Sequence, residues 1–147
     1  MAYSGRFFPQ NPKKYTGDVN NIFYRSLWER TVFVKLDTWD NVLEWCSEEQ
    51  RIYYRSPIDS KIHCYFPDVF VKLKTPTGIK SAILEVKPKK QTILPKKPKR
   101  VTKRYINECM EYERNQAKWE AAREFCKKKG WEFLVLTEDE IYGKTDK

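Results

Sequence analysis

Two stretches decide the fold: residues 66–71 read Phe-Pro-Asp-Val-Phe-Val, and residues 83–88 read Ile-Leu-Glu-Val-Lys-Pro. Each embeds a carboxylate among apolar and β-branched residues that are typical of buried strands. The turn-forming sequence Thr-Pro-Thr-Gly lies between them at residues 75–78, and it predicts an antiparallel hairpin. Asp68 lies early in the first strand and Glu85 at the end of the second, so we expect these two positions to face each other.

Glu85 and Lys87 are two residues apart and project from the same face of the second strand. An acid, an acid and a base therefore share one corner with Asp68. Buried carboxylates repel each other, and each costs on the order of several kcal/mol to desolvate, but a divalent cation between them reverses that penalty. Mg²⁺ takes oxygen ligands and retains several waters, so two or three carboxylates suffice. This arrangement favours metal-assisted hydrolysis of a phosphodiester, in which a lysine positions or activates water. A Glu85–Lys87 pair at a solvated strand edge is the alternative.

Positive charge is concentrated immediately after this corner. The 147-residue chain has 29 basic and 20 acidic residues and a net charge of +9, and nine basic residues but no acidic one lie between Lys87 and Arg104. Removing those nine leaves 20 basic residues, which balance the 20 acidic ones. Three prolines and the absence of a helical or strand period predict an extended loop at residues 88–104.

A cluster of excess positive charge indicates a polyanion as partner, and here we expect DNA. A nuclear localisation signal at residues 95–101 is the alternative interpretation. The predicted nucleic-acid-binding residues are Lys89, Lys90, Gln91, Lys96, Lys97, Lys99, Arg100, Lys103 and Arg104.

The length of the chain predicts one domain with a single core. Residues 1–21 are rich in Pro, Asn, Gly and Lys and are expected to form an irregular arm, which leaves residues 22–147 as the domain.

No apolar run is long enough to span a bilayer and the first residues lack a signal-peptide core, so we expect a soluble intracellular protein without membrane contact. The cysteines lack the close pairs of a zinc site and are expected to be reduced thiols: Cys46, Cys64, Cys109 and Cys126.

The remaining pattern predicts a small α/β domain around a mixed sheet. The capping-box spacing at Ser26 predicts a helix that begins there and ends near Asp37. Gly130 is expected to end a long helix. Thr137 can cap a last short helix. Strands are expected at residues 42–45, 51–54, 63–73, 79–86 and 131–136, and the long helix at residues 102–129.

Three short motifs resemble those of a known superfamily. They are Tyr-Arg-Ser-Leu-Trp-Glu at residues 24–29, Phe-Pro-Asp at 66–68 and Leu-Glu-Val-Lys-Pro at 84–88. They are similar to motifs of the restriction-endonuclease-like PD-(D/E)xK superfamily, within it to the TnsA endonuclease N-terminal group, and more closely to the tailed-phage head completion nucleases. Residues 115–130 and 133–138 resemble the last helix and strand of that family. The resemblance covers roughly residues 20 to 142.

The resemblance implies a restriction-endonuclease-like mixed β-sheet flanked by helices, and a DNA endonuclease dependent on Mg²⁺ or Mn²⁺. It implies Asp68, Glu85 and the Val86 carbonyl as metal ligands and Lys87 at the attacking water. It also implies Glu29 as a further ligand or a contact to a second metal. Glu29 is, however, the last residue of the capping box, and the two roles compete for one carboxylate.

Two departures favour the phage family over the transposition group. That group carries glutamine at the position matching Glu85, and this chain ends soon after its last expected helix without a further domain.

The expected role is head completion after DNA packaging, in the host cytoplasm during assembly or in the virion. The expected partners are DNA and the portal or other head-completion proteins. The alternatives are a structural plug that binds the DNA end or portal, with incidental or no catalysis, and a transposition or junction-resolving endonuclease.

Overall fold

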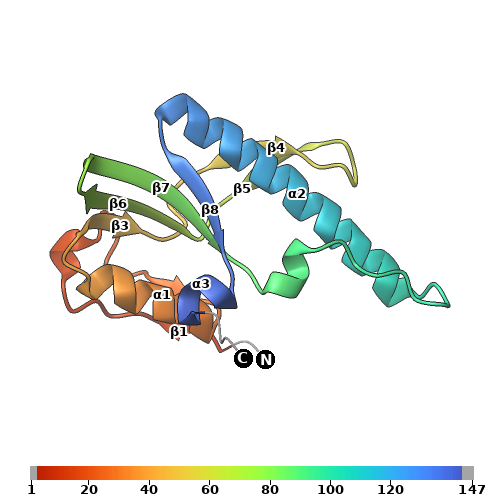
Figure 1. The fold of residues 1–147 in the computed structure, drawn as a ribbon, viewed down its shortest axis with the longest axis horizontal. Helices are drawn as coiled ribbons and strands as arrows, with labels where there is room; N and C mark the ends of the chain where they lie inside the picture. The colour runs from red at the N-terminus through yellow and green to blue at the C-terminus, as the bar shows by residue number, and fades with distance from the viewer. Residues whose placement is uncertain (1–2, 144–147) are drawn as a thin grey trace.

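The computed structural model describes residues 3–143 and contains a four-stranded mixed sheet with helices on both faces (Figure 1). The strand order is β3-β6-β7-β8, in which β3, β6 and β7 are antiparallel and β8 runs parallel to β7. The strand bounds are Val42–Cys46 for β3, Val69–Thr75 for β6, Gly78–Val86 for β7 and Glu132–Leu136 for β8. The predicted restriction-endonuclease-like α/β class is confirmed.

The two sheet faces are covered by different helices. The helix bounds are Leu27–Thr38 for α1, Lys103–Lys129 for α2 and Glu138–Tyr142 for α3. Side chains alternate along β8, so that Leu134 and Leu136 line a groove with residues of α1 and α3, whereas Phe133 and Val135 pack with Trp119 of α2. The sheet is therefore enclosed between α1 with α3 on one side and α2 on the other.

The predicted helix boundaries agree with the structure. The hydroxyls of Ser26 and Thr102 each accept a hydrogen bond from a backbone N–H in the first turn of α1 and α2. Gly130 follows α2 with φ of +75°, the left-handed conformation that glycine adopts without a steric penalty. Thr137 and Glu140 form a reciprocal capping box at the start of α3.

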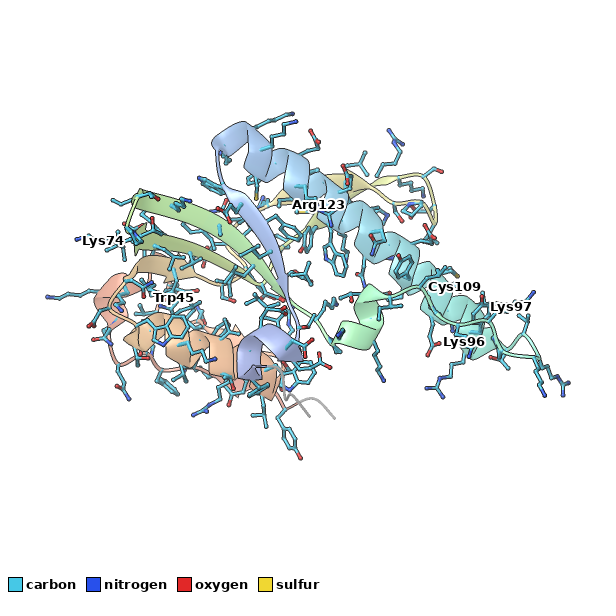
Figure 2. All side chains as sticks on the ribbon, viewed as in Figure 1. Trp45, Lys74, Lys96, Lys97, Cys109 and Arg123 are labelled. Atoms are coloured by element: carbon cyan, nitrogen blue, oxygen red, sulfur yellow. The ribbon has the colours of Figure 1, made fainter. Side chains whose placement is uncertain are left out.

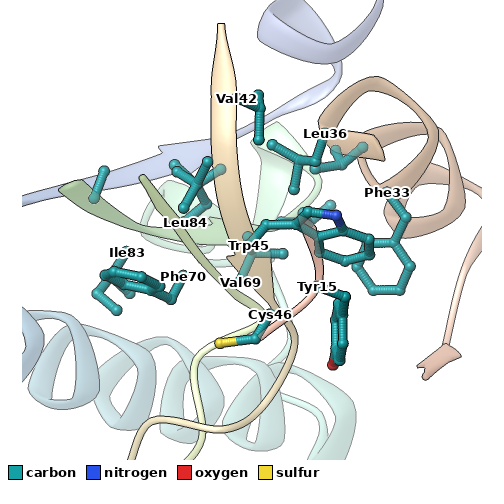
Figure 3. Packing of buried hydrophobic residues seen from close by; sticks show 14 of the residues in the cluster. Tyr15, Phe33, Leu36, Val42, Trp45, Cys46, Val69, Phe70, Ile83 and Leu84 are labelled. Atoms are coloured by element: carbon teal, nitrogen blue, oxygen red, sulfur yellow. The ribbon is translucent and has the colours of Figure 1, made fainter. Parts of the chain in front are cut away.

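The core on the α1 side is centred on Trp45 of β3 and includes Phe7 and Tyr15 from the N-terminal segment. Trp45 is fully buried between Phe33 of α1 and the rings of Phe7 and Tyr15 (Figure 3). Short strands also pair there, β1 (Gly5–Arg6) with β2 (Phe23–Tyr24), and the 3-10 helix η1 covers Pro12–Lys14. The segment that we expected to be an irregular arm thus contributes two aromatic side chains to the core, and the domain boundary at residue 21 remains a prediction.

The single strand predicted over residues 63–73 is wrong, because the chain forms two strands there. β5 (Ile62–Tyr65) pairs with β4 (Ile52–Arg55) in a separate two-stranded sheet, and β6 starts at Val69. Pro67 lies in the break; it has no N–H to donate to a strand ladder, and this explains the interruption. The β4–β5 hairpin packs against α2.

The basic loop is not wholly extended. The 3-10 helix η2 covers Lys89–Thr92, where the Gln91 N–H donates to the Pro88 carbonyl at 2.9 Å. The rest of the loop runs alongside the N-terminal half of α2, away from the sheet (Figure 1). Within residues 3–143, no helix combines the length and the apolar character needed to cross a membrane.

Candidate active site

Asp68 and Glu85 come together where the β6–β7 hairpin ends. The register pairs Val69 with Leu84, so Asp68, one residue before β6, lies opposite Glu85 at the end of β7. The Oδ2 atom of Asp68 accepts a hydrogen bond from the Val86 N–H at 2.7 Å. This bond holds the Asp68 carboxylate against the backbone that directly follows Glu85. The two carboxylates therefore face each other, as the hairpin geometry predicted.

A cavity of about 650 Å³ opens over the two carboxylates. Lys87 lines it, and the Lys87 N–H donates to the Leu136 carbonyl at 3.0 Å, which continues the β7–β8 pairing past the strand end. Asp68, Glu85, Lys87 and Glu29 therefore share one cavity. Its lining residues are Arg25, Glu29, Glu48, Cys64, Tyr65, Phe66, Asp68, Glu85, Val86, Lys87 and Lys118.

The electrostatics of the cavity disfavour ionised carboxylates in the absence of a cation. Burial raises the pKa of Asp68 well above its usual range, and the negative charges of Glu85 and Glu29 raise that pKa further. Burial also raises the pKa of Glu85, although a hydrogen bond from Tyr65 and two nearby lysines oppose the shift. A positive ion placed between these carboxyl groups would remove the repulsion that the fold imposes.

Tyr65 and Lys118 belong to the site and were not predicted from the sequence. The Tyr65 hydroxyl donates to the Oε1 atom of Glu85 at 2.5 Å. The Lys118 ammonium lies over the Tyr65 ring, 5.6 Å from its centroid. Tyr65 stands three positions before Asp68, which is its one sequence signal. Lys118 is one of several lysines on α2 and carries no such signal.

Glu29 is buried at the first turn of α1 and closes only half of the expected capping box. Ser26 accepts from the Glu29 N–H at 3.2 Å, but the Glu29 carboxylate accepts from the N–H of Arg25, at 3.3 Å, rather than from that of Ser26. Burial raises the pKa of Glu29. The carboxylate therefore lies within the cavity but is held at the helix terminus.

The donor set fits a hydrated Mg²⁺ or Mn²⁺ ion. Among residues 3–143, no three side chains of the His, Cys, Asp and Glu types are grouped closely enough to hold a metal, so Glu29 does not complete a three-carboxylate site in this conformation. Asp68 and Glu85 remain as a pair of carboxylate oxygen donors. Mg²⁺ is commonly bound through one or two carboxylates and keeps several waters, whereas structural zinc requires four nitrogen or sulfur ligands.

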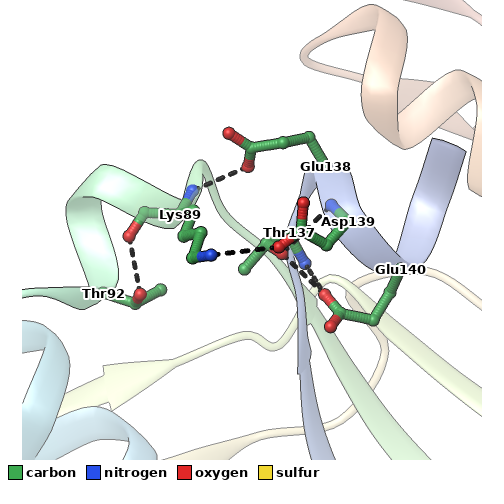
Figure 4. Close-up of polar contacts among 6 residues, drawn as sticks. All are labelled: Lys89, Thr92, Thr137, Glu138, Asp139 and Glu140. Atoms are coloured by element: carbon green, nitrogen blue, oxygen red, sulfur yellow. Dashed lines mark hydrogen bonds and ion pairs between the residues drawn. The ribbon is translucent and has the colours of Figure 1, made fainter. Parts of the chain in front are cut away.

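Lys89, predicted to bind nucleic acid, is bound to α3 (Figure 4). Its N–H donates to Glu138 Oε1 at 2.8 Å, and its ammonium forms an ion pair with Asp139 at 3.2 Å. Lys89 therefore connects the start of the basic loop to the C-terminal helix.

The other predicted DNA-binding residues lie along the loop and the start of α2. Lys90, Gln91 and Lys96 line a cavity of about 380 Å³ between the loop and α2. Arg104 forms an ion pair with Glu108 at 3.3 Å. Lys96 and Lys97 extend at the end of the molecule far from Lys74 (Figure 2). Within the described part of the chain, six of these exposed cations form no ion pair: Lys90, Lys96, Lys97, Lys99, Arg100 and Lys103.

Fold and site together define a nuclease of the restriction-endonuclease-like class. The family described as TnsA-like endonuclease N terminal matches residues 39–138, a range that contains Asp68, Glu85 and Lys87 and begins after Glu29. The chain belongs to this family. It is 39% identical over 143 residues to the head completion nuclease of Enterobacteria phage T4, and the match covers 95% of this chain and 93% of that protein. The resemblance seen in the sequence motifs is confirmed.

Proposed function

We propose that this chain is a metal-dependent DNA endonuclease that acts in phage head completion after DNA packaging. The main support for nuclease chemistry is that Asp68, Glu85 and Lys87 line one cavity beside the basic loop. The biological role is supported by the 39% sequence identity with the head completion nuclease of phage T4, which extends over nearly the whole of both chains. By this proposal the protein works in the host cytoplasm during assembly, or in the virion.

In the proposed mechanism, Asp68, Glu85 and the Val86 carbonyl would hold Mg²⁺ or Mn²⁺. When bound, such an ion supplies Lewis-acid chemistry that lowers the pKa of water and neutralises charge on the phosphoryl group. Lys87 donates a hydrogen bond to the attacking water and holds it in line with phosphorus. The water gives up a proton to solvent and its oxygen forms a new bond to phosphorus, while the phosphorus–oxygen bond to the leaving strand breaks and the leaving oxygen takes up a proton from solvent.

The exposed cations of the basic loop would hold the DNA backbone near this cavity. Phosphate contacts of this kind position the duplex without reading its bases. Because Lys89 is paired with Asp139, we assign backbone binding chiefly to Lys90 and to the unpaired cations farther along the loop. The portal or other head-completion proteins are the further partners that we propose.

Incubation with supercoiled plasmid tests the proposal. We expect nicked and linear products in Mg²⁺ or Mn²⁺ and none in excess EDTA, because hydrolysis requires the ion. Protein that binds the plasmid but leaves it intact in both metals would contradict the nuclease proposal and would favour a structural plug.

Replacing Glu29 with glutamine separates its two candidate roles. Glutamine can also accept the hydrogen bond from the Arg25 N–H, so we expect the melting temperature to stay close to wild type. If the carboxylate contacts a metal, cleavage should fall by on the order of 10²-fold or more, since an anionic ligand that helps to hold the metal is lost. We expect this fall. Single-turnover rates and thermal melts of the same preparations decide it, and a fully active Glu29→Gln protein would falsify the ligand role.

A further inference from the structure

Lys118 is an ammonium group in the active-site cavity that forms no direct ion pair with a described residue, although the carboxylates of Glu111 and Glu85 lie near enough to favour its charged form. It lies on α2 and lines the cavity together with Glu85 of β7 and Lys87, the residue that follows this strand, and it is half-buried. No ion pair or hydrogen bond links its side chain to another residue between positions 3 and 143; its described contact is with the face of the Tyr65 ring. Burial lowers the pKa of Lys118, as expected for a cation that has lost part of its hydration.

An ammonium in such a position is energetically unfavourable unless a ligand compensates it. An aromatic face attracts a cation only weakly when both are partly exposed to water. The next residue of the helix, Trp119, is 2% exposed, and Ala122 one turn later is fully buried. This packing anchors the segment of α2 that carries Lys118. The backbone that carries Lys118 is therefore held beside the cavity by the core of the protein.

Tyr65 connects this lysine to the proposed metal-binding carboxylates. Its hydroxyl donates to Glu85 while its ring lies beneath the Lys118 ammonium. Two cations that form no ion pair with any residue from 3 to 143 thus line the same cavity as the carboxylates and come from different elements, Lys87 just after β7 and Lys118 of α2. An anionic group that enters the cavity could contact both.

We propose that Lys118 is a catalytic residue that binds a non-bridging oxygen of the scissile phosphate, an inference that rests on the proposed nuclease function. Negative charge on the phosphoryl oxygens must be stabilised as the transition state forms. A cation fixed beforehand in a partly dehydrated site stabilises that charge without reorganisation. Lys118 therefore acts mainly on the rate of the bound complex, in contrast to the cations of the loop, which contribute general DNA affinity.

Three variants test this assignment. Lys118→Met keeps the apolar part of the side chain and removes the charge, whereas Lys118→Arg keeps the charge. Lys127→Met is the control, at an exposed position of the same helix. Each is measured in single-turnover cleavage of plasmid in Mg²⁺, with the DNA affinity in EDTA and the melting temperature determined in parallel. We expect Lys118→Met to slow cleavage at saturating DNA by about 10²-fold, with affinity changed less than about threefold, because a single lysine adds little to contacts spread over many phosphates.

Lys118→Arg should recover at least a tenth of the wild-type rate, and Lys127→Met should match wild type. Equal saturated rates for wild type and Lys118→Met would overturn the assignment, and so would an equal loss in Lys127→Met. If Lys118→Met melts at a much lower temperature than wild type, its slow cleavage could reflect unfolding, and Lys118→Arg then provides the test. A Lys118→Arg protein that is folded but cleaves as slowly as Lys118→Met would contradict a role for the charge. Failure of wild type itself to cut DNA in either metal would instead refute the proposed nuclease function.

Discussion

Replacing Asp68 with asparagine, or Glu85 with glutamine, is expected to abolish DNA cleavage while the protein stays folded. Each change removes one of the two carboxylate ligands proposed for the metal and leaves the shape of the side chain nearly intact. A metal ion contributes several kcal/mol to transition-state stabilisation, and each 1.4 kcal/mol is tenfold in rate, so we expect losses on the order of 10³-fold or more. Asp40→Asn, at an exposed position after α1, is the matched control.

The same two substitutions should stabilise the metal-free protein at neutral pH. Burial raises the pKa of Asp68 and of Glu85 in the folded state above the ordinary value of about 4. The folded state therefore binds more protons than the unfolded state between the ordinary and the raised pKa, so stability falls as pH rises through that window. An amide does not titrate, and we expect it to add on the order of 1 kcal/mol at neutral pH.

Urea unfolding in EDTA at pH 5 and pH 8 measures this effect, with Asp40→Asn alongside. The wild-type protein should lose more stability between the two pH values than either active-site variant. Added Mg²⁺ should then raise the stability of the wild type, by about 2.7 kcal/mol at a concentration 100 times Kd, and should leave both variants nearly unchanged. A variant that keeps wild-type activity and the full response to Mg²⁺ would remove its carboxylate from the mechanism.

Replacing Lys96, Lys97, Lys99 and Arg100 with glutamine is expected to weaken DNA binding strongly and to flatten its salt dependence. Each lysine or arginine that neutralises a phosphate adds about 0.9 to the slope of log affinity against log salt on duplex DNA. Four neutralised charges, not all of which reach a phosphate, should reduce that slope by roughly two to four units. Sequence preference should not change, since backbone contacts do not read bases.

Fluorescence titrations against salt in EDTA measure the slope without cleavage. A second quadruple variant removes the same charge from exposed positions outside the loop: Lys61, Lys80, Lys127 and Lys128. We expect this control to retain a slope close to that of wild type. In Mg²⁺, the loop variant should cleave slowly at low DNA concentration and at nearly the wild-type rate at saturation, because the contacts are common to ground and transition states. Equal slopes for the two variants would indicate that net charge, not the loop, attracts the DNA.

The sequence predicted the parts of the site that depend on local pattern. The turn at residues 75–78 sets the hairpin register, and from that register alone Asp68 is opposite Glu85. Alternation along one strand then places Lys87 on the same side as Glu85. The boundaries at Thr102 and Gly130 follow from capping chemistry in the same way.

What could not be predicted depends on packing between distant segments. Tyr65 reaches Glu85 from a strand that belongs to another sheet, and Lys118 reaches Tyr65 from a helix more than fifty residues away. The alternation of residues 63–73 was interpreted as one strand because its apolar pattern continues through the break at Pro67. Phe7 enters the core whereas the adjacent Phe8 is exposed, and no local period distinguishes the two.

The parallel pairing of β7 with β8 has a consequence for the order in which the chain is made. β7 carries Glu85, but its partner β8 is synthesised only after the whole of α2, and Lys89 finds Glu138 49 residues farther along the chain. Until then β7 is an open edge, and the hydrogen bonds that β8 and α3 make to Lys87 and Lys89 are missing. A nascent chain on the ribosome therefore carries its acidic residues without an assembled catalytic centre. Under the proposed function, competence to cut DNA would therefore arise only late in translation.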